Sequence, residues 1–581
     1  MKKMKSTVLL IAAFWGIVCA GIFARPSAVG AAEFKPVAVI SLTDADTFIK
    51  TAKDVTAKAG FPDVMASFEQ FVGGIEVFNK TKPKGIVILS DGETFQGYAF
   101  APVTDFTELP MASTLELENP SEGTYLLTLP NEWSVHFKQE KEWLFVSLTE
   151  LPKTLPADPS VYLGGLEKKY LASVEINVEN LPKQVCLSLL DVARVMIGMT
   201  MTDENIRVNF DSAIDQAEKA LDQVKMIRYG FLIDPVTSDM VLEAYEEVFP
   251  DTEFAELLQQ QSKRQTGSIG FFRPEDSLLA GILAFPIMEE QKEQLQSMTK
   301  LYFSQFREGH EGVGLDEKDS ELLGQLIDNL ENAVSGTIDA GKFDAGFSIL
   351  NTSTVLGITT AAEGEKLADS LKRFVEEIVE KIPAEVGEHL KISVEKYKGY
   401  QLASFVFPLA ECGFPELPDT SKNISLTLSF GTRNDSLCFA AGVNQNVTAD
   451  LKKAIDASQT PVILPETVYV IAPAAITKIA KTWVPQLLEE GEYTDAVKAV
   501  KYILAVFEEC PRDATITASH VYNGLTVTGK LTVSAKLYPV IAKLLKIVLE
   551  SKSATVHEDV KMFELDEVEE LEEIEKSGNG Q

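Results

Sequence analysis

The stretch ITASHVYNGLTVTGKLTV, residues 516–533, carries the signal that decides the fold class. Apolar and polar side chains alternate on both sides of Asn523-Gly524. Alternation with a period of two is typical of a half-buried β-strand, and Asn-Gly between two such runs is the strongest short-range signal for a hairpin. We therefore predict two antiparallel strands joined by a tight turn.

This hairpin belongs to an order of elements that recurs four times along the chain. Each unit starts with an apolar strand, continues with two amphipathic helices and a hairpin, and ends with a closing helix. The units cover about residues 37–117, 170–262, 278–382 and 467–550. Their hairpin turns include Asp91-Gly92, Asp234-Pro235 and Asn523-Gly524, and their helices include Phe48–Ala59, Pro62–Val72, Ile214–Val224, Ile476–Leu488 and Val497–Phe507.

Further strands are expected between the units. A hairpin of Tyr125–Leu129 and Val135–Leu148 separates the first two units. A longer set, Ile392–Phe407 and Ile424–Val443 followed by a helix at Leu451–Ile455, separates the last two. The order of unit, hairpins and unit thus occurs twice.

We therefore expect an internal duplication, with halves over residues 32–265 and 270–550 joined by the polar segment Ser262–Ser268. The alternative is that such patterns arise in any α+β protein without common descent of the halves. A true duplication predicts the same strand order in both halves and equivalent positions for the Asp234-Pro235 and Asn523-Gly524 hairpins. The place where the halves meet is then the first place to search for a ligand.

The expected fold class is α+β. Hairpins with amphipathic helices between them predict antiparallel sheets with helices packed on one face, rather than a doubly wound parallel sheet.

The first 31 residues are typical of a secretory signal peptide. Lys2, Lys3 and Lys5 precede an uncharged apolar run, Val8–Phe23, and small residues lead to Val29-Gly30-Ala31, which suits signal peptidase. An uncleaved anchor is the alternative, but the run is shorter than the roughly 20 residues that cross a bilayer. Lipid attachment at Cys19 is disfavoured because Val18, before it, is not small. We expect a periplasmic or extracellular protein without a transmembrane segment in the mature chain.

The charge balance bounds the kinds of partner. Removing residues 1–31 leaves 49 basic and 86 acidic residues, a formal charge of −37. Such a field repels nucleic acid, so a nucleic-acid role is excluded. Residues 556–581 are strongly acidic and are expected to be disordered.

Four cysteines remain after export: Cys186, Cys412, Cys438 and Cys510. Four thiols allow three pairings, and their density is far below that of disulfide-built scaffolds. We expect a Cys412–Cys438 bridge, because both residues lie in the set of strands between the third and fourth units. Two buried free thiols are the alternative.

Three short motifs resemble known sites but lack required residues. Gly524–Lys530 has the spacing of a phosphate-binding loop, but Leu531 replaces the Ser or Thr and the segment alternates like a strand. Gly309–Glu317 combines glycine, histidine and acids but matches neither a calcium loop nor a zinc motif, which favours a flexible loop between helices. Ser297–Lys300 fits the Ser-x-x-Lys of penicillin-binding enzymes, whose other motifs are absent.

The remaining polar clusters have ordinary structural explanations. Neighbouring acids such as Glu246-Glu247 and Glu508-Glu509 do not face one another. Trp133 and Trp143 near His136 are typical of a cross-strand aromatic cluster. We assign no catalytic, cofactor-binding or metal-binding residue and no cofactor from the sequence.

Several loose motifs carry a resemblance to a known group of proteins. They are Val39–Leu42 after the signal peptide, Val103-Thr104-Asp105, Leu155–Pro159, and Ala441-Gly442-Val443 leading into Leu451–Asp456. Together they resemble the large secreted proteins of planctomycete-type bacteria. The resemblance spans most of the chain and implies no activity and no catalytic residues.

Three functions are compatible with these observations. A non-enzymatic exported protein with a structural, envelope-associated or partner-binding role is favoured by the charge and the repeated units. A carrier of an apolar ligand such as a lipid is the alternative, because curved antiparallel sheets can enclose a cavity. A hydrolase assembled from residues distant in sequence needs no local motif and remains a third.

The signal peptide gives the first testable prediction. The natively exported chain should begin near Ala32, because cleavage follows Val29-Gly30-Ala31. Intact-mass spectrometry of the exported protein measures this. A chain that retains Met1, or one that starts at an acylated Cys19, would contradict the prediction.

Overall fold

The structure is a computed structural model whose described part omits several expected segments. It describes residues 34–62, 79–108, 117–121, 123–128, 134–152, 154–200, 204–287, 289–310, 317–381, 390–408, 425–443, 446–463, 466–474, 477, 503–511 and 513–545. Several expected segments lie outside the described residues. They are the expected signal peptide and acidic tail, nearly all of Pro62–Val72 and Ile476–Leu488, the first part of Val497–Phe507, and Cys412.

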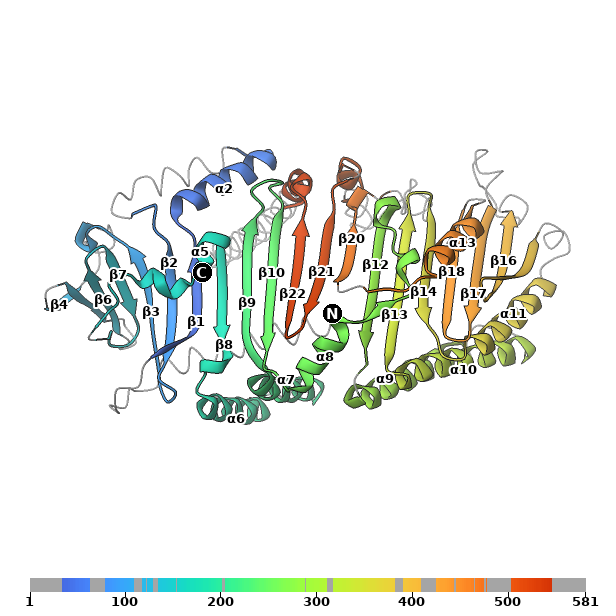
Figure 1. The fold of residues 1–581 in the computed structure, drawn as a ribbon, viewed down its shortest axis with the longest axis horizontal. Helices are drawn as coiled ribbons and strands as arrows, with labels where there is room; N and C mark the ends of the chain where they lie inside the picture. Colours follow the sequence, from blue (N-terminus) through green and yellow to red (C-terminus); the bar gives the residue numbers. More distant parts are fainter. Residues whose placement is uncertain are drawn as a thin grey trace, which may run out of the picture.

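One open antiparallel sheet runs along the whole described chain (Figure 1). It contains twenty strands, and every pairing between them is antiparallel. From edge to edge the order is β4-β5-β6-β7-β3-β2-β1-β8-β9-β10-β22-β21-β20-β12-β13-β14-β18-β17-β16-β15. The antiparallel α+β expectation is therefore correct.

The strands fall into two sets of ten. The first set is β1 (Lys35–Leu42), β2 (Lys84–Ser90), β3 (Phe95–Pro102), β4 (Glu118–Ser121), β5 (Thr124–Thr128), β6 (Ser134–Glu140), β7 (Trp143–Ser147), β8 (Ala172–Asn177), β9 (Val224–Ile233) and β10 (Met240–Val248). The second set is β12 (Ser277–Pro286), β13 (Lys342–Leu350), β14 (Thr354–Thr360), β15 (Lys391–Tyr397), β16 (Tyr400–Pro408), β17 (Ser425–Arg433), β18 (Ser436–Gly442), β20 (Glu466–Ile471), β21 (Ile516–Asn523) and β22 (Thr526–Val533). A separate pair joins β11 (Gln265–Thr266) to β19 (Val462–Ile463).

The two sets have the same strand order. Numbered within its own set, each runs 4-5-6-7-3-2-1-8-9-10 from its outer edge to the middle of the sheet. The tenth strands, β10 and β22, pair with each other and make the sheet continuous. The β9–β10 and β21–β22 hairpins therefore occupy equivalent places.

The helices connect strands in a recurring way. Their bounds are α2 (Ala45–Lys58), α5 (Leu166–Lys169), α6 (Lys183–Thr200), α7 (Glu204–Gln223), α8 (Glu253–Ser262), α9 (Glu289–His310), α10 (Glu317–Asp339), α11 (Gly364–Lys381) and α13 (Val447–Ala457). The pairs α6–α7 and α9–α10 each follow the opening strand of a unit and precede its hairpin, as the periodicity predicts. In Figure 1 they lie along the lower ends of the strands.

Local chemistry explains the turns. Between β21 and β22 the central residues are Gly524 and Leu525, and Gly524 has φ +60°. Glycine is favoured at the first central position of such a two-residue turn because it adopts positive φ without a steric cost. The predicted hairpin is thus confirmed, but its central residues are Gly524-Leu525, one position after the expected Asn523-Gly524. The strand expected over Val135–Leu148 is instead two strands, because Lys141 takes φ +55° and turns the chain between β6 and β7.

Helices pack on both faces of the sheet, so the expectation of one covered face is wrong. Leu451 and Ile455 of α13 pack with Leu356 of β14. Ala255 and Leu258 of α8 pack near Tyr522 of β21 on the other face. Cross-strand partners share a face, and successive residues of one strand alternate between the two faces. Following the partners from β14 to β21 therefore places Leu356 and Tyr522 on opposite faces. We call these the α13 face and the α8 face.

The largest cores lie toward the two ends of the α13 face. At the second-half end, Leu356 and Leu402 are covered by α13 and by Phe271. At the first-half end, Phe100 and Phe145 are covered by a segment that includes Leu155 and Leu163. Both covering segments connect the seventh and eighth strands of their set. The middle of this face therefore lies between two covered regions.

A core substitution tests this assignment of faces. Leu356 is fully buried beneath α13, so Leu356→Ala should lower the free energy of unfolding by about 2–5 kcal/mol through lost burial and a cavity. Leu242 is a matched control, since it lies in a strand on the α8 face and is 48% exposed. Leu242→Ala should change stability by no more than about 0.5 kcal/mol. Urea unfolding of the full chain measures both, and equal losses would contradict the assignment.

Candidate functional site

The middle of the α13 face carries charged and hydroxyl side chains at the junction of the halves. We call this the central strip and define it by Glu175, Arg228, Glu243, Tyr245 and Lys530. These residues come from β8, β9, β10 and β22, four consecutive strands of the sheet. Because the halves meet here, the strip is the first candidate for a site.

One row of the strip joins three strands of the first half. Glu175, Arg228 and Tyr245 are direct cross-strand partners. Two guanidinium nitrogens of Arg228 lie 2.8 and 2.6 Å from Glu175 Oε2, and the guanidinium lies 5.3 Å from the centre of the Tyr245 ring. An ion pair and a cation–π contact thus tie β8, β9 and β10 together.

The second row crosses from the first half to the second. Glu243 and Lys530 are cross-strand partners in the β10–β22 pairing. The Tyr170 hydroxyl donates to Glu243 Oε1 at 2.7 Å, and Lys169 forms an ion pair with the same oxygen. Tyr170 reaches this position because Gly230 leaves room for its ring: a Cβ at Gly230 would lie 2.2 Å from it.

These contacts set the ionisation of Glu243. Burial alone would raise its pKa, but the hydrogen bonds from Lys169 and Tyr170, together with the charges of Lys169 and Lys530, lower it. Glu243 is therefore ionised at neutral pH and surrounded by donors. A carboxylate in this state stabilises the junction and is a poor general base.

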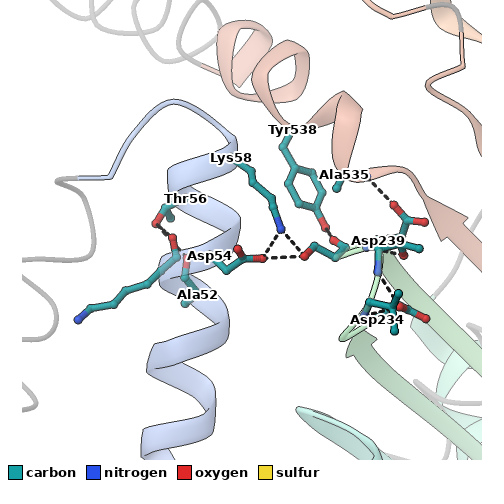
Figure 2. A network of polar contacts seen from close by, with 12 residues as sticks. Ala52, Asp54, Thr56, Lys58, Asp234, Asp239, Ala535 and Tyr538 are labelled. Carbon is teal, nitrogen blue, oxygen red and sulfur yellow. Dashed lines mark hydrogen bonds and ion pairs between the residues drawn. The ribbon is translucent and has the colours of Figure 1, made fainter.

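A second polar network connects three distant parts of the chain (Figure 2). Ser238, in the β9–β10 turn, donates from Oγ to Asp54 Oδ2 of α2 at 2.8 Å. Lys58 contacts both groups and lies 2.7 Å from Asp54 Oδ2. The hydrogen bond from Lys58 is the main cause that lowers the pKa of Asp54.

The segment after β22 completes this network. The Tyr538 hydroxyl donates to the Ser238 backbone oxygen at 2.6 Å, and burial raises the Tyr538 pKa to about 12, so the phenol keeps its proton. Asp239 Oδ1 accepts from the Ala535 amide at 2.8 Å. The β9–β10 turn is therefore held by α2 on one side and by the segment after β22 on the other.

The structure places the short motifs in ordinary elements. Gly524–Lys530 spans the turn and β22, so its amides belong to a sheet and do not open a helix. Ser297 lies within α9 and donates back to the Glu293 carbonyl oxygen at 2.9 Å. Trp143 is a buried core residue whose ring packs edge-on against that of Phe100, with 5.6 Å between the ring centres.

The other motif residues lie partly within and partly outside the described residues. Gly309 and His310 end α9, Glu317 begins α10, and residues 311–316 between them lie outside the described residues, as does Trp133. His136 lies on β6. Glu247 pairs with Lys225 at 2.8 Å, and Glu509 pairs with Lys543.

The described cysteines are buried free thiols. Cys438 is free, so the expected Cys412–Cys438 disulfide is wrong, and Cys412 itself lies outside the described residues. Burial raises the pKa of Cys438 to about 12 and that of Cys186 to about 11. Burial also raises the pKa of Cys510. Thiols held in this state are unreactive and serve as small apolar core residues.

Within the described residues, no cluster of three or more His, Cys, Asp or Glu side chains could hold a metal ion. Among the helices of the same residues, none is long and apolar enough to cross a membrane. The sequence singled out neither the central strip nor the Ser238 network. The alternation of β9 and β10 indicated a polar face, but which polar residues meet depends on long-range register.

No protein-family model, curated protein or solved structure matches the chain.

The Ser238 network gives a backbone prediction. Ser238 has φ +60°, a left-handed conformation that costs a side-chain-bearing residue about 1–2 kcal/mol. Ser238→Gly and Ser238→Ala both remove the hydroxyl, but only glycine relieves this cost. The Gly variant should therefore be the more stable by about 1 kcal/mol in urea unfolding.

The neighbouring Thr237 is the matched control for this comparison, because it is exposed and its φ is not positive. There the Ala variant should be the more stable, since glycine only adds conformational entropy to the unfolded chain. The same ranking at both positions would contradict the strain at Ser238.

Proposed function

We propose that this chain is an exported, non-enzymatic protein whose sheet is a binding platform for a protein partner. The observation that carries the proposal is the distribution of exposed apolar side chains over the two faces. Eight large hydrophobic residues within the strands of the α8 face are 36–48% exposed: Leu42, Ile86, Leu242, Phe285, Ile392, Val394, Leu428 and Phe439.

The other face differs. Among strand residues of the described chain, Val521 is the one comparably exposed large hydrophobic side chain on the α13 face. Single exposed apolar residues are normal, but a set that keeps to one face along a whole sheet marks an interaction surface. The eight residues extend from β2 to β15, so they form a long platform.

The shape of this distribution favours a protein partner over an apolar ligand. A carrier buries most of its ligand's surface in a cavity lined by apolar side chains. Here the apolar residues are spread along an open sheet, between edges far apart in Figure 1. The charge of −37 expected for the mature chain favours a partner whose rim around the apolar contact is basic.

Two further parts of the proposal concern origin and location. The shared strand order supports descent of the two halves from one ancestral half, with the junction at β10–β22. The signal-like N-terminus and the resemblance to secreted planctomycete-type proteins support export. Carriage of a lipid is the competing function, and it would use the same apolar face.

Site-specific photo-crosslinking in the producing cell distinguishes these functions. A photoreactive residue at Phe439, on the α8 face, should give a discrete protein adduct. Val521 is the matched control, because it is 39% exposed against 44% for Phe439 but lies on the other face. A probe at Val521 should give no such adduct.

Two other outcomes would overturn the proposal. Adducts of lipid mass at Phe439, found by mass spectrometry, would establish the carrier function instead. Equal labelling at Phe439 and Val521 would show that the apolar face has no special role. Loss of the Phe439 adduct on adding Phe285→Ser on the same face would support the platform.

A further inference from the structure

The sheet has two outer edges, and they differ in how they are protected. β4 and β15 are the terminal strands, each paired on one side within the described chain. An unprotected terminal strand presents unpaired N–H and C=O groups to any other strand. The two strands hold the same place in their sets, the fourth in chain order.

β4 has the features of a blocked edge. It is four residues long, contains Pro120, and its register with β5 is shifted by an irregularity between Glu118 and Ser121. Short length, proline and bulges are the usual ways in which proteins prevent further pairing at an edge.

β15 lacks these features. It pairs with β16 over seven residues without a register shift, and it contains no proline. Six of its seven residues are exposed, among them Ile392 at 42% and Val394 at 47%. A regular, exposed strand with apolar side chains at a sheet edge is a template for another strand.

The turn after β15 fixes which amides point outward. Lys398 and Gly399 have φ +51° and +85°, which defines a two-residue turn of the mirror-image type. The flanking pair Tyr397 and Tyr400 is then a hydrogen-bonded pair. Because direction alternates along a strand, residues 395, 393 and 391 bond to β16, and residues 396, 394 and 392 direct their amides to the free edge.

We propose that β15 pairs antiparallel with β15 of a second copy of this chain, in a register centred on Ser393. The sequence of the strand is self-complementary in this register. Lys391 faces Glu395 of the second copy and Ile392 faces Val394, and each pairing occurs twice by symmetry. Residues 392 and 394 supply the outward-pointing amides that this pairing needs.

The side chains also lie on the appropriate faces. Ile392 and Val394 belong to the α8 face, so the apolar platform continues across the junction. Lys391 and Glu395 belong to the α13 face, where Glu395 Oε1 already contacts Lys452 of α13 at 2.7 Å. This contact orients the carboxylate and leaves its second oxygen for Lys391 of the second copy. The β10–β22 junction uses the same arrangement, with Glu243 opposite Lys530.

A charge-swap experiment on the full mature chain tests the partner and the register together. Lys391→Glu places two glutamates opposite each other at both symmetric positions, and Glu395→Lys places two lysines opposite each other. Each single variant should dimerise at least about tenfold more weakly than the parent chain in sedimentation equilibrium. An equimolar mixture of the two variants should recover dimers. In a pair of unlike chains a glutamate faces a lysine at both positions, whereas each variant paired with itself places like charges opposite each other at both.

Two further variants separate this edge from other modes of association. Val394→Pro removes an outward-pointing amide and spares the bonds to β16, so it should abolish the dimer without unfolding the chain, as circular dichroism would show. Lys396→Glu is the control, since residue 396 faces Leu390 in this register and should leave dimerisation unchanged.

Three results would overturn the inference: a parent chain that is monomeric at all accessible concentrations, a dimer that survives Val394→Pro, or variants that do not recover dimers on mixing. The inference does not depend on the proposed function. A monomeric chain that still crosslinks a protein at Phe439 would refute self-pairing and leave the platform intact.

Discussion

Antiparallel pairing between β10 and β22 is the interaction on which the rest of the structure depends. It joins residues 240–247 to residues 526–533, strands that are far apart in the chain. Closing so long a loop has an entropic cost, which the backbone hydrogen bonds and the surrounding side chains must offset. The bonds of Tyr538 and Ala535 to Ser238 and Asp239 lie at one end of this pairing and strengthen it.

Continuity across this junction gives the whole molecule two unlike faces. Every strand alternates its side chains between the same two sides. This alternation therefore decides which residues share a face from one edge of the sheet to the other. The connections between seventh and eighth strands cover both ends of the α13 face, and charged partners occupy its middle. The α8 face receives α8 near its centre but keeps a series of apolar side chains in contact with solvent. This difference between the faces is the observation that supports the proposed binding platform.

Much of the fold followed from periodicity, because periodicity is a local property. The apolar stripes of α9, α10 and α11 and the alternation of β9 and β10 indicated the elements themselves. The β6–β7 turn was missed because Lys141, in a left-handed conformation, replaces the expected glycine. The helix-covered face was misjudged because the side on which α13 or α8 packs depends on register summed over many strands. The central strip could not be predicted from the sequence for the same reason, since Glu175, Arg228 and Tyr245 meet only when three strands are aligned.

The two edges of the sheet show which features the fold itself does not dictate. β4 and β15 hold the same place in sets of identical strand order, so topology alone would make them alike. They differ in three of the properties that control edge pairing: β4 is short, irregular and contains Pro120, whereas β15 is longer, regular and free of proline. Blocking one edge while leaving the other regular limits association to a pair of chains, because a second open edge would allow chains to add without end. In the proposed self-pairing, the Lys-Ile-Ser-Val-Glu order of β15 also selects the partner, because it places Lys391 opposite Glu395 and Ile392 opposite Val394.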